Sequence, residues 1–431
     1  PPASSQSTVP LIATRDIFTA LEVPDFRWLW IGSLGSSFAM NMQIVARGWL
    51  VYTLTSSALD LAWVTLSFMV PQVAFSLWGG VVADRVRKKR IIIIAQTLNC
   101  IATLILGVIV FTDRVEFWDF IWFGFFNGTV LAMSMPARQA FVPELIPEKL
   151  IFTAMALNTT CWNLSRIIGP SVAGGLIAVL AQGDTSSTYG VGIVYFVIAV
   201  LYFLSAITMG LVSQQGQIKP DNGQSALGDV GEAMRYVWEN PPVFGLILLS
   251  IVPFLFGMPL NTLLPAFTED ILGGQADDLG FLMSCMGVGA IVGSLMLAAM
   301  GGLRNKGAWI VASCVGWGAF TVAFGFTETL WFACAMIVLI GWISAWNMSL
   351  NRGLLQLQID PNMRGRVLAI DMMSHGLMPI GVIPISLIAE IYDVAVALMV
   401  AGGIFVVVIL LLLAVSVSVR AIDRYPPPLE Q

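Results

Sequence analysis

The chain has 431 residues, of which 57% are apolar and only 11% are charged, and its mean hydropathy is +0.85. Soluble domains carry about 25% charged residues, so the composition excludes a soluble enzyme and indicates an all-α membrane protein. The net charge of −5 comes partly from acids in predicted outer loops, and no basic nucleic-acid footprint is present.

Windows of about 19 residues predict twelve apolar spans, each long enough to cross a hydrocarbon core of roughly 30 Å. In chain order the spans are 28–52, 61–83, 91–112, 117–137, 152–181, 191–213, 243–266, 279–301, 308–326, 330–350, 367–389 and 394–418. The longest polar interval between spans, 214–242, separates the first six spans from the last six. The predicted domains are a cytoplasmic tail (1–27), a six-helix bundle (28–213), a cytoplasmic linker with an amphipathic segment (214–242), a second six-helix bundle (243–419) and a cytoplasmic tail (420–431).

The positive charges predict the orientation. Of the 21 Lys and Arg residues, Arg47 and Arg166 lie within spans and Arg114 lies in an outer loop, which leaves 18 in loops or tails on one face. Short loops rich in Lys and Arg stay on the cytoplasmic side of a membrane. We therefore expect a multi-pass protein of the plasma (inner) membrane with both termini in the cytoplasm.

The residues that usually build catalytic or metal sites are few and scattered. The chain has one histidine, and its five cysteines all fall inside spans without a C-x-x-C pair. It also lacks the G-x-x-x-x-G-K-[ST] loop of a nucleotide-driven pump. We predict no metal site, no cofactor and no enzymatic activity.

The two groups of six spans resemble each other. A shift of 214 places Arg138 on Arg352, and it also places Pro147 and Pro170 on prolines of the second half. Matches that recur at half the chain length agree with the division of the spans and are typical of duplicated transporter folds.

Several phrases carry a resemblance to a known family. Residues 80–90, GVVADRVRKKR, are similar to the loop between the second and third spans of the major facilitator superfamily, G-x-L-a-D-R-x-G-R-R-x, with Arg87 where a glycine is common. The phrases at 48–59, 136–147, 163–174 and 364–370 resemble the branch of the enterobactin exporter and of macrolide and multidrug efflux proteins. The resemblance implies two pseudo-equivalent bundles of six helices.

The same resemblance assigns a conformational role to the loop after the second span. It implies that Asp84, with Gly80 allowing close approach, latches the two halves together in the outward-open state. Its expected partners are the start of the eleventh helix and Arg364 or Arg366, because a charge at a helix start is stabilising. The alternative is that the bases of this loop only fix the topology. The predicted latch residues are Gly80, Asp84, Arg85, Arg90, Arg364 and Arg366.

The fifth span combines a proline with small residues. Pro170 bends a helix, and Gly169 and Gly174 let a neighbouring helix come close. The pattern resembles the antiporter motif of the superfamily. It has one residue more than that motif between the Gly-Pro pair and the pair of glycines that follows. The alternative is a packing kink that has no bearing on the direction of transport.

Charged and polar residues within the spans predict a wet central path. Arg166 lies near the middle of the fifth span, where a charge is costly unless it faces water or a partner, whereas Arg47 is close enough to one end to reach the interface. Polar stripes at helical spacing on other spans either line the same path or join helices. The predicted cavity residues are Gln43, Arg47, Asn127, Ser134, Arg166, Asn261, Ser344 and Asn347.

One acid and the single histidine stand one turn apart in the eleventh span. An acid beside His375 favours its protonated form, so Asp371 and His375 are candidates for carrying coupling protons. The alternative is that His375 is an ordinary interfacial residue.

Together these features predict a monomeric secondary transporter that exports amphiphilic, drug-like or siderophore-like small molecules by alternating access and proton antiport. Because no acid lies as deep as Arg166, we expect an anionic or acceptor-rich substrate. The alternatives are a lipid or lysolipid flippase of the same fold and a non-transporting membrane receptor or assembly factor.

Overall fold

The computed structural model describes residues 19–147, 150–181, 188–217, 226–300, 305–360, 363, 366–368, 370–371 and 375–423. Every regular element within these ranges is a helix. In the first half they are η1 (Thr19–Glu22), α1 (Pro24–Thr55), α2 (Ala58–Ala74), α3 (Ser76–Arg85), α4 (Lys88–Phe111), α5 (Phe117–Leu145), α6 (Ile151–Leu180) and α7 (Thr188–Gly210).

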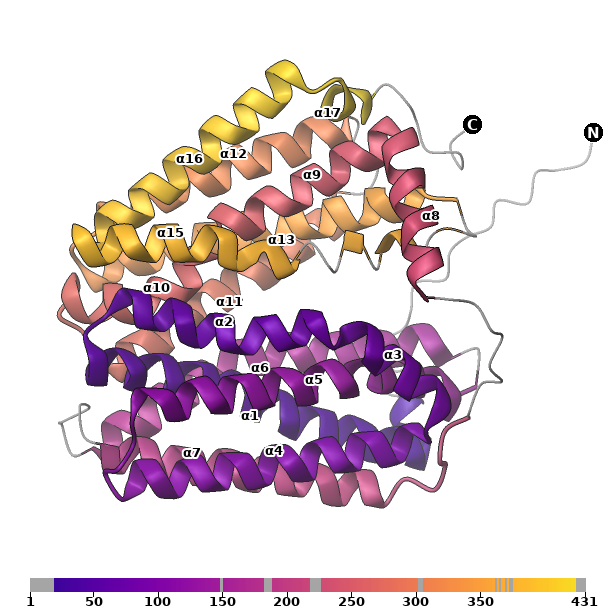
Figure 1. Ribbon diagram of the computed structural model, residues 1–431, viewed down its shortest axis with the longest axis vertical. Coiled ribbons are helices and arrows are strands. Elements are labelled where there is room, and N and C mark those ends of the chain that lie inside the picture. Colours follow the sequence, from indigo (N-terminus) through magenta and orange to yellow (C-terminus); the bar gives the residue numbers. More distant parts are fainter. Residues whose placement is uncertain are drawn as a thin grey trace, which may run out of the picture.

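α8 (Ala226–Glu239) lies in the predicted linker. The helices of the second half are α9 (Pro241–Phe256), α10 (Pro259–Asp270), α11 (Ala276–Ala299), α12 (Lys306–Gly325), α13 (Leu330–Gln358), η3 (His375–Leu377), α15 (Met378–Ile391), α16 (Val394–Val415) and α17 (Val417–Ala421). Figure 1 shows the helices of each half side by side, with α8 lying across the ends of the others.

Length and composition identify most of these helices as membrane spans. Nine of the described helices, with α9 and α10 taken together, are long and apolar enough to cross a bilayer, and the bent pair α2 and α3 makes a tenth. The 32-residue α1 and the shorter apolar α15 pack against these spans. The architecture is consistent with the twelve predicted spans.

Three predicted spans differ in their details. Span 61–83 is divided between α2 and α3, which bend by 53° relative to each other at Phe75. Span 243–266 is broken at Gly257 and Met258, because Pro259 starts a new helix. Within span 367–389, residues 367, 368, 370 and 371 are helical, and the helix α15 begins at Met378.

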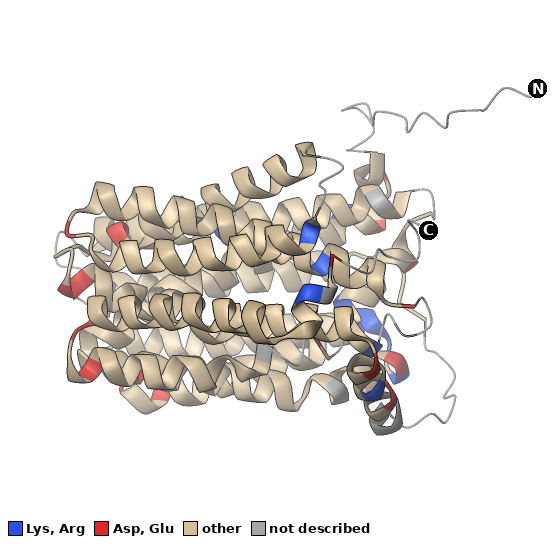
Figure 2. Ribbon diagram, turned by 90° about the horizontal axis from the view of Figure 1, so that it is seen from above, with Lys and Arg blue, Asp and Glu red and all other residues tan. Residues whose placement is uncertain are grey.

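Two pairs of helices form the most extensive contacts between the halves. α6 packs along α11, and α2 packs along α15. Lys and Arg gather toward one end of the helices, whereas the turns at the other end carry mostly Asp and Glu (Figure 2). This charge distribution supports the predicted orientation, with the basic end in the cytoplasm.

Candidate functional site

A cavity of about 480 Å³ lies where the two halves meet. Its lining comes from α1, α2, α4, α5, α6 and α7 of the first half and from α9 to α13 and α15 of the second. A volume of this size matches the lower part of the range of small-molecule sites. Six of the eight predicted cavity residues line it, namely Gln43, Arg47, Asn127, Arg166, Asn261 and Ser344.

Both predicted arginines reach this cavity. The Arg47 guanidinium carbon lies 5.5 Å from the centre of the Phe68 ring, a cation–π contact that holds the side chain against α2. Arg47 therefore turns inward and does not extend to the membrane interface. Arg166 is half-buried on α6. Among the described lining residues there is no Asp or Glu to neutralise the two charges.

Amide and hydroxyl groups complete the polar side of the cavity. The Tyr202 hydroxyl donates to Oε1 of Gln43 over 3.4 Å, and Nδ2 of Asn127 donates to the Phe123 carbonyl over 3.3 Å. Oδ1 of Asn99 also lies at this side and is buried without a hydrogen-bond partner among the described residues. Such a buried acceptor requires a water molecule or a ligand.

Two predicted cavity residues lie elsewhere. Ser134 is buried, and its hydroxyl donates to the Leu131 carbonyl within α5. Asn347 donates from Nδ2 to Ser313 Oγ at 2.9 Å and to Cys314 Sγ at 3.0 Å, which joins α13 to α12. Asn347 therefore forms a contact between helices, which was the alternative interpretation of the polar stripes.

Arg138 corrects the assignment of one positive charge to a cytoplasmic loop. Because α5 continues to Leu145, Arg138 lies inside the helix, and its guanidinium donates to Ser36 Oγ over 2.9 Å and to Ser33 Oγ over 3.4 Å. It thereby holds α5 against α1. The predicted span ended one residue too early to include it.

The predicted latch lies at the basic end of α3 and α4. Asp84, Arg85 and Arg90 are exposed there. A Cβ on Gly80 would meet no atom within 4 Å, whereas a Cβ on Gly79 would overlap the Ala132 carbonyl oxygen. The close approach to α5 is thus made by Gly79, and the role expected of Gly80 in the outward-open state stays a prediction.

Of the two arginines expected to meet Asp84, Arg366 is among the described residues. Arg366 Nη1 forms an ion pair with Glu232 Oε2 of α8 at 2.6 Å, and Arg364 lies outside the described residues. The Tyr236 hydroxyl of α8 also bonds to Asp360, and partial burial raises its pKa. α8 is thereby fastened to the second half. A latch at Asp84 stays a prediction.

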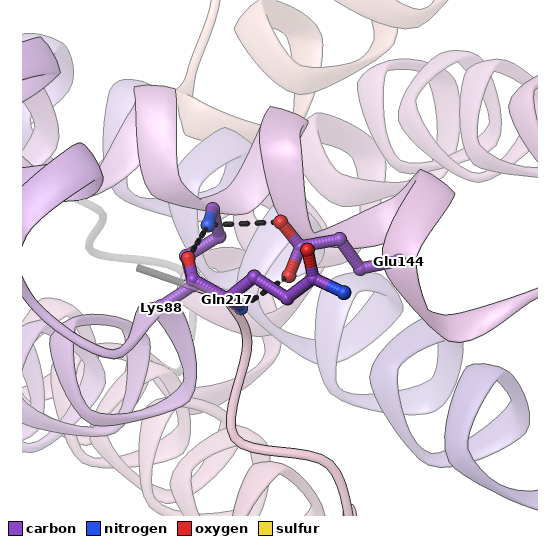
Figure 3. Close-up of polar contacts among 3 residues, drawn as sticks. All are labelled: Lys88, Glu144 and Gln217. Atoms are coloured by element: carbon purple, nitrogen blue, oxygen red, sulfur yellow. Dashed lines mark hydrogen bonds and ion pairs between the residues drawn. The ribbon is translucent and has the colours of Figure 1, made fainter. Parts of the chain in front are cut away.

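Lys88 also lies at the basic end. The sequence suggested for it only a role in fixing the topology. Its side chain is fully buried, and Nζ lies 2.8 Å from Glu144 Oε1. Figure 3 shows the same ammonium donating to the Gln217 carbonyl, while the Gln217 amide donates to Glu144 over 2.8 Å. The start of the linker is therefore bound to α4 and α5.

The glycines and proline of α6 lie at the boundary between the halves. A Cβ on Gly174 would overlap the Ala276 carbonyl oxygen of α11, and a Cβ on Gly280 of α11 would overlap the Pro170 carbonyl oxygen. On its other side, Gly169 approaches Asn41 of α1. The motif gives α6 close backbone contact with two helices at once. A role in the direction of transport stays a prediction.

Of the proton-coupling candidates, Asp371 is buried, with 3% of its surface exposed. His375 begins η3, and its side chain lies outside the described set. Their mutual contact stays a prediction.

The fold, the central cavity and the α6 contact with α11 can now be compared with known proteins. A family model described as transmembrane secretion effector matches residues 16–427. The chain belongs to this family of major facilitator transporters. Membership assigns it to transporters and not to enzymes, and it makes the cavity at the boundary between halves the candidate substrate site.

Several curated relatives of this transporter are similar over most of its length. The staphyloferrin A transporter of Staphylococcus aureus is 26% identical over 85% of this chain and 87% of the relative. The multidrug efflux pump Tap of Mycolicibacterium fortuitum is 22% identical over 80% and 84%. The enterobactin exporter EntS of Shigella boydii is 24% identical over 83% and 81%.

Solved structures of other transporters share the fold. The nucleoside transporter NupG superposes with a TM-score of 0.72 at 16% identity, covering 93% of this chain and all of that chain. A bacterial homologue of the lysosomal transporter Spinster, in an inward-facing and occupied conformation, gives 0.70 at 12% identity, covering 93% of this chain and 96% of that chain.

In this transporter, polar contacts join the halves at the acidic end, and none of them was expected from the sequence. The Tyr52 hydroxyl of α1 donates to Asp270 of α10. Oε2 of Glu390, at the end of α15, accepts from Ser57 Oγ at 3.0 Å and from the Leu59 amide at 3.3 Å. Only the place of Glu390 directly after the predicted span 367–389 could have suggested such a contact.

Proposed function

We propose that this protein exports amphiphilic small molecules across the inner membrane by alternating access, driven by proton antiport. The observation that carries the proposal is the cavity between the halves, which combines two arginines and several amides with a large apolar lining. The named relatives, which transport or export siderophores and drugs, support the direction and the size class of the substrate.

The charges of the cavity favour a substrate with an anionic or acceptor-rich group. Two cations in a site of low polarity need an offsetting group, and the described lining offers amides and hydroxyls but no carboxylate. A carboxylate or sulfonate on the substrate, positioned between Arg47 and Arg166, would supply it. Asp371 and His375 remain the proposed carriers of the coupling protons.

The remaining parts of the proposal concern topology. The predicted cytoplasmic termini accord with the basic end of the helices lying in the cytoplasm, and the predicted domain ranges and monomeric state complete the proposal. The contacts of Tyr52 and Glu390 would then close the outer end, and the cavity would be loaded from the inner side.

The test uses three probes with the same apolar body. Everted membrane vesicles with an acidic lumen are supplied with pyrenebutyrate, its neutral methyl ester or pyrenebutylamine, and probe uptake is measured with and without a protonophore. We expect uptake of pyrenebutyrate that depends on the protein and stops when the proton gradient is collapsed.

The alternatives give different results in the same vesicles. Protein-dependent uptake that persists without the gradient would contradict proton antiport. Movement of headgroup-labelled phospholipid without movement of any pyrene probe would favour a flippase, and binding of a probe without movement would favour a receptor.

A further inference from the structure

The two walls of the central cavity differ in chemistry. The first half supplies 19 lining residues, of which nine are polar or charged, including both arginines. The second half supplies 15 lining residues, of which only Asn261, Thr262 and Ser344 are polar or charged. A polar wall and an apolar wall therefore face each other across the boundary between the halves.

The apolar wall is rich in methionine. Five of its 15 residues are methionines, although the whole chain has only 20 methionines in 431 residues. They come from the break before α10 and from α11, α13 and α15, so the periodicity of no single helix accounts for the cluster. The five residues are Met258, Met283, Met286, Met348 and Met378.

The two walls also differ in how firmly their side chains are held. Arg47 is stacked on Phe68, and Gln43 accepts a hydrogen bond from Tyr202, so contacts within the first half fix both groups. A guanidinium is moreover a rigid, planar donor of fixed geometry. Methionine, by contrast, is unbranched and polarisable and fits apolar groups of different shapes.

We propose that substrates bind in one orientation, with an anionic head on the polar wall of the first half and an apolar body on the methionine wall of the second. The polar wall selects the head, and the methionine wall sets how many different bodies are accepted. The substrates are thus a class of organic anions that share a head and vary in the body. The inference rests on the proposed function and specifies its substrate.

The orientation also determines which contacts a substrate makes. A molecule with both ends contacts both halves, whereas a bare anion or a bare hydrocarbon contacts only one. Because the free energy of binding can favour a state only through contacts that differ between states, only the two-ended molecule stabilises the arrangement in which both walls enclose it.

The experiment measures equilibrium binding to the full-length protein in lipid nanodiscs. One set of probes varies the head on a pyrene body, as carboxylate, methyl ester and amine. The other set keeps the carboxylate and varies the body, as planar pyrenebutyrate, linear dodecanoate and compact adamantaneacetate. We expect the parent to bind the three carboxylates within about tenfold of one another and to bind pyrenebutylamine at least about tenfold more weakly.

Two variants test the two walls independently. Arg166→Gln should weaken all three carboxylates by a similar factor of about tenfold. The double variant Met283→Leu with Met286→Leu keeps the volume but stiffens the wall, so it should weaken some bodies about fivefold or more and leave at least one unchanged. Met296→Leu is the control, since Met296 lies on the same helix but is exposed on its outer surface.

Each other outcome overturns the inference. If the double variant weakens the three bodies equally, or no more than Met296→Leu does, the methionine wall does not choose the body. If Arg166→Gln affects one body selectively, the head does not lie at the polar wall. A parent that transports pyrenebutyrate but binds the amine as tightly would refute this inference alone, whereas a parent that neither binds nor transports any probe would refute the proposed function as well.

Discussion

Burying the Lys88 ammonium at the start of α4 costs desolvation free energy that its neighbours have to offset. Glu144 provides the opposite charge at 2.8 Å, and the Gln217 carbonyl accepts a further hydrogen bond. Lys89 adds a bond from Nζ to the Gly210 carbonyl at 2.9 Å. At the residue scale, two lysines of a basic loop thus hold the end of α7 and the segment that follows it.

Removing the Lys88 charge should destabilise the protein. Lys88→Met keeps the length of the side chain but leaves Glu144 without its cation, and we expect a loss of about 1–3 kcal/mol in stability. The measurement is thermal unfolding in detergent. Arg235→Met is the control, because the Arg235–Glu239 pair is exposed on α8 and its loss should change nothing measurable. Equal unfolding temperatures for the two variants would contradict the assigned role of Lys88.

At the scale of elements, α2 packs along α15, and a carboxylate contact joins the two helices at one end. Glu390 at the end of α15 accepts hydrogen bonds at the start of α2, where the helix dipole favours a negative charge. The predicted latch would place Asp84, at the end of α3, against the start of the eleventh span. One helix pair would thus carry a carboxylate contact at each side of the membrane.

The outer contact is testable by amide hydrogen exchange. Glu390→Gln keeps the shape but removes the charge, so the peptide that contains Leu59 should exchange roughly two- to fivefold faster at neutral pH. Asp393→Asn is the control, since Asp393 caps α16 of its own half through the Ala395 amide and should leave that peptide unchanged. Unchanged exchange in Glu390→Gln would show that the contact does not hold the outer end closed.

Adjacent glycines of α6 provide a second test at this scale. Gly174→Ala inserts a methyl group against the Ala276 carbonyl oxygen, whereas Gly175→Ala meets no atom within 4 Å. Overpacking of this kind costs about 1–3 kcal/mol, so Gly174→Ala should reduce pyrenebutyrate uptake several-fold and Gly175→Ala should not. The same uptake by both variants would mean that the contact of α6 with α11 does not limit transport.

Hydropathy predicted the helices because a bilayer requires long apolar segments with internally bonded backbones, and α4, α7 and α16 follow their predicted spans closely. It could not place the break at Phe75, because apolar residues continue across it from α2 into α3. The sequence also could not predict the methionine wall or the burial of Lys88, because each depends on residues from several helices. A polar residue within a span could be assigned to the cavity or to a contact between helices only from its neighbours on other helices, and Asn347 faces Ser313 and Cys314 of α12.

At the scale of the whole molecule, proton coupling should appear in the pH dependence of transport. His375→Gln keeps a polar side chain of similar size that cannot titrate, so the pH profile of pyrenebutyrate uptake should flatten. Binding of the same probe in nanodiscs should stay within about twofold of the parent. A variant that keeps the parental pH profile would assign His375 a structural role.

The linker between the halves is fastened at both ends. Lys88 and Glu144 hold Gln217 on the first half, and Glu232 and Tyr236 hold α8 on the second. Only nine peptide units connect Gln217 with Ala226, and a chain of that length extends to about 30 Å at most. In the proposed transport cycle, the length of this segment therefore limits how far the basic ends of the two halves can separate.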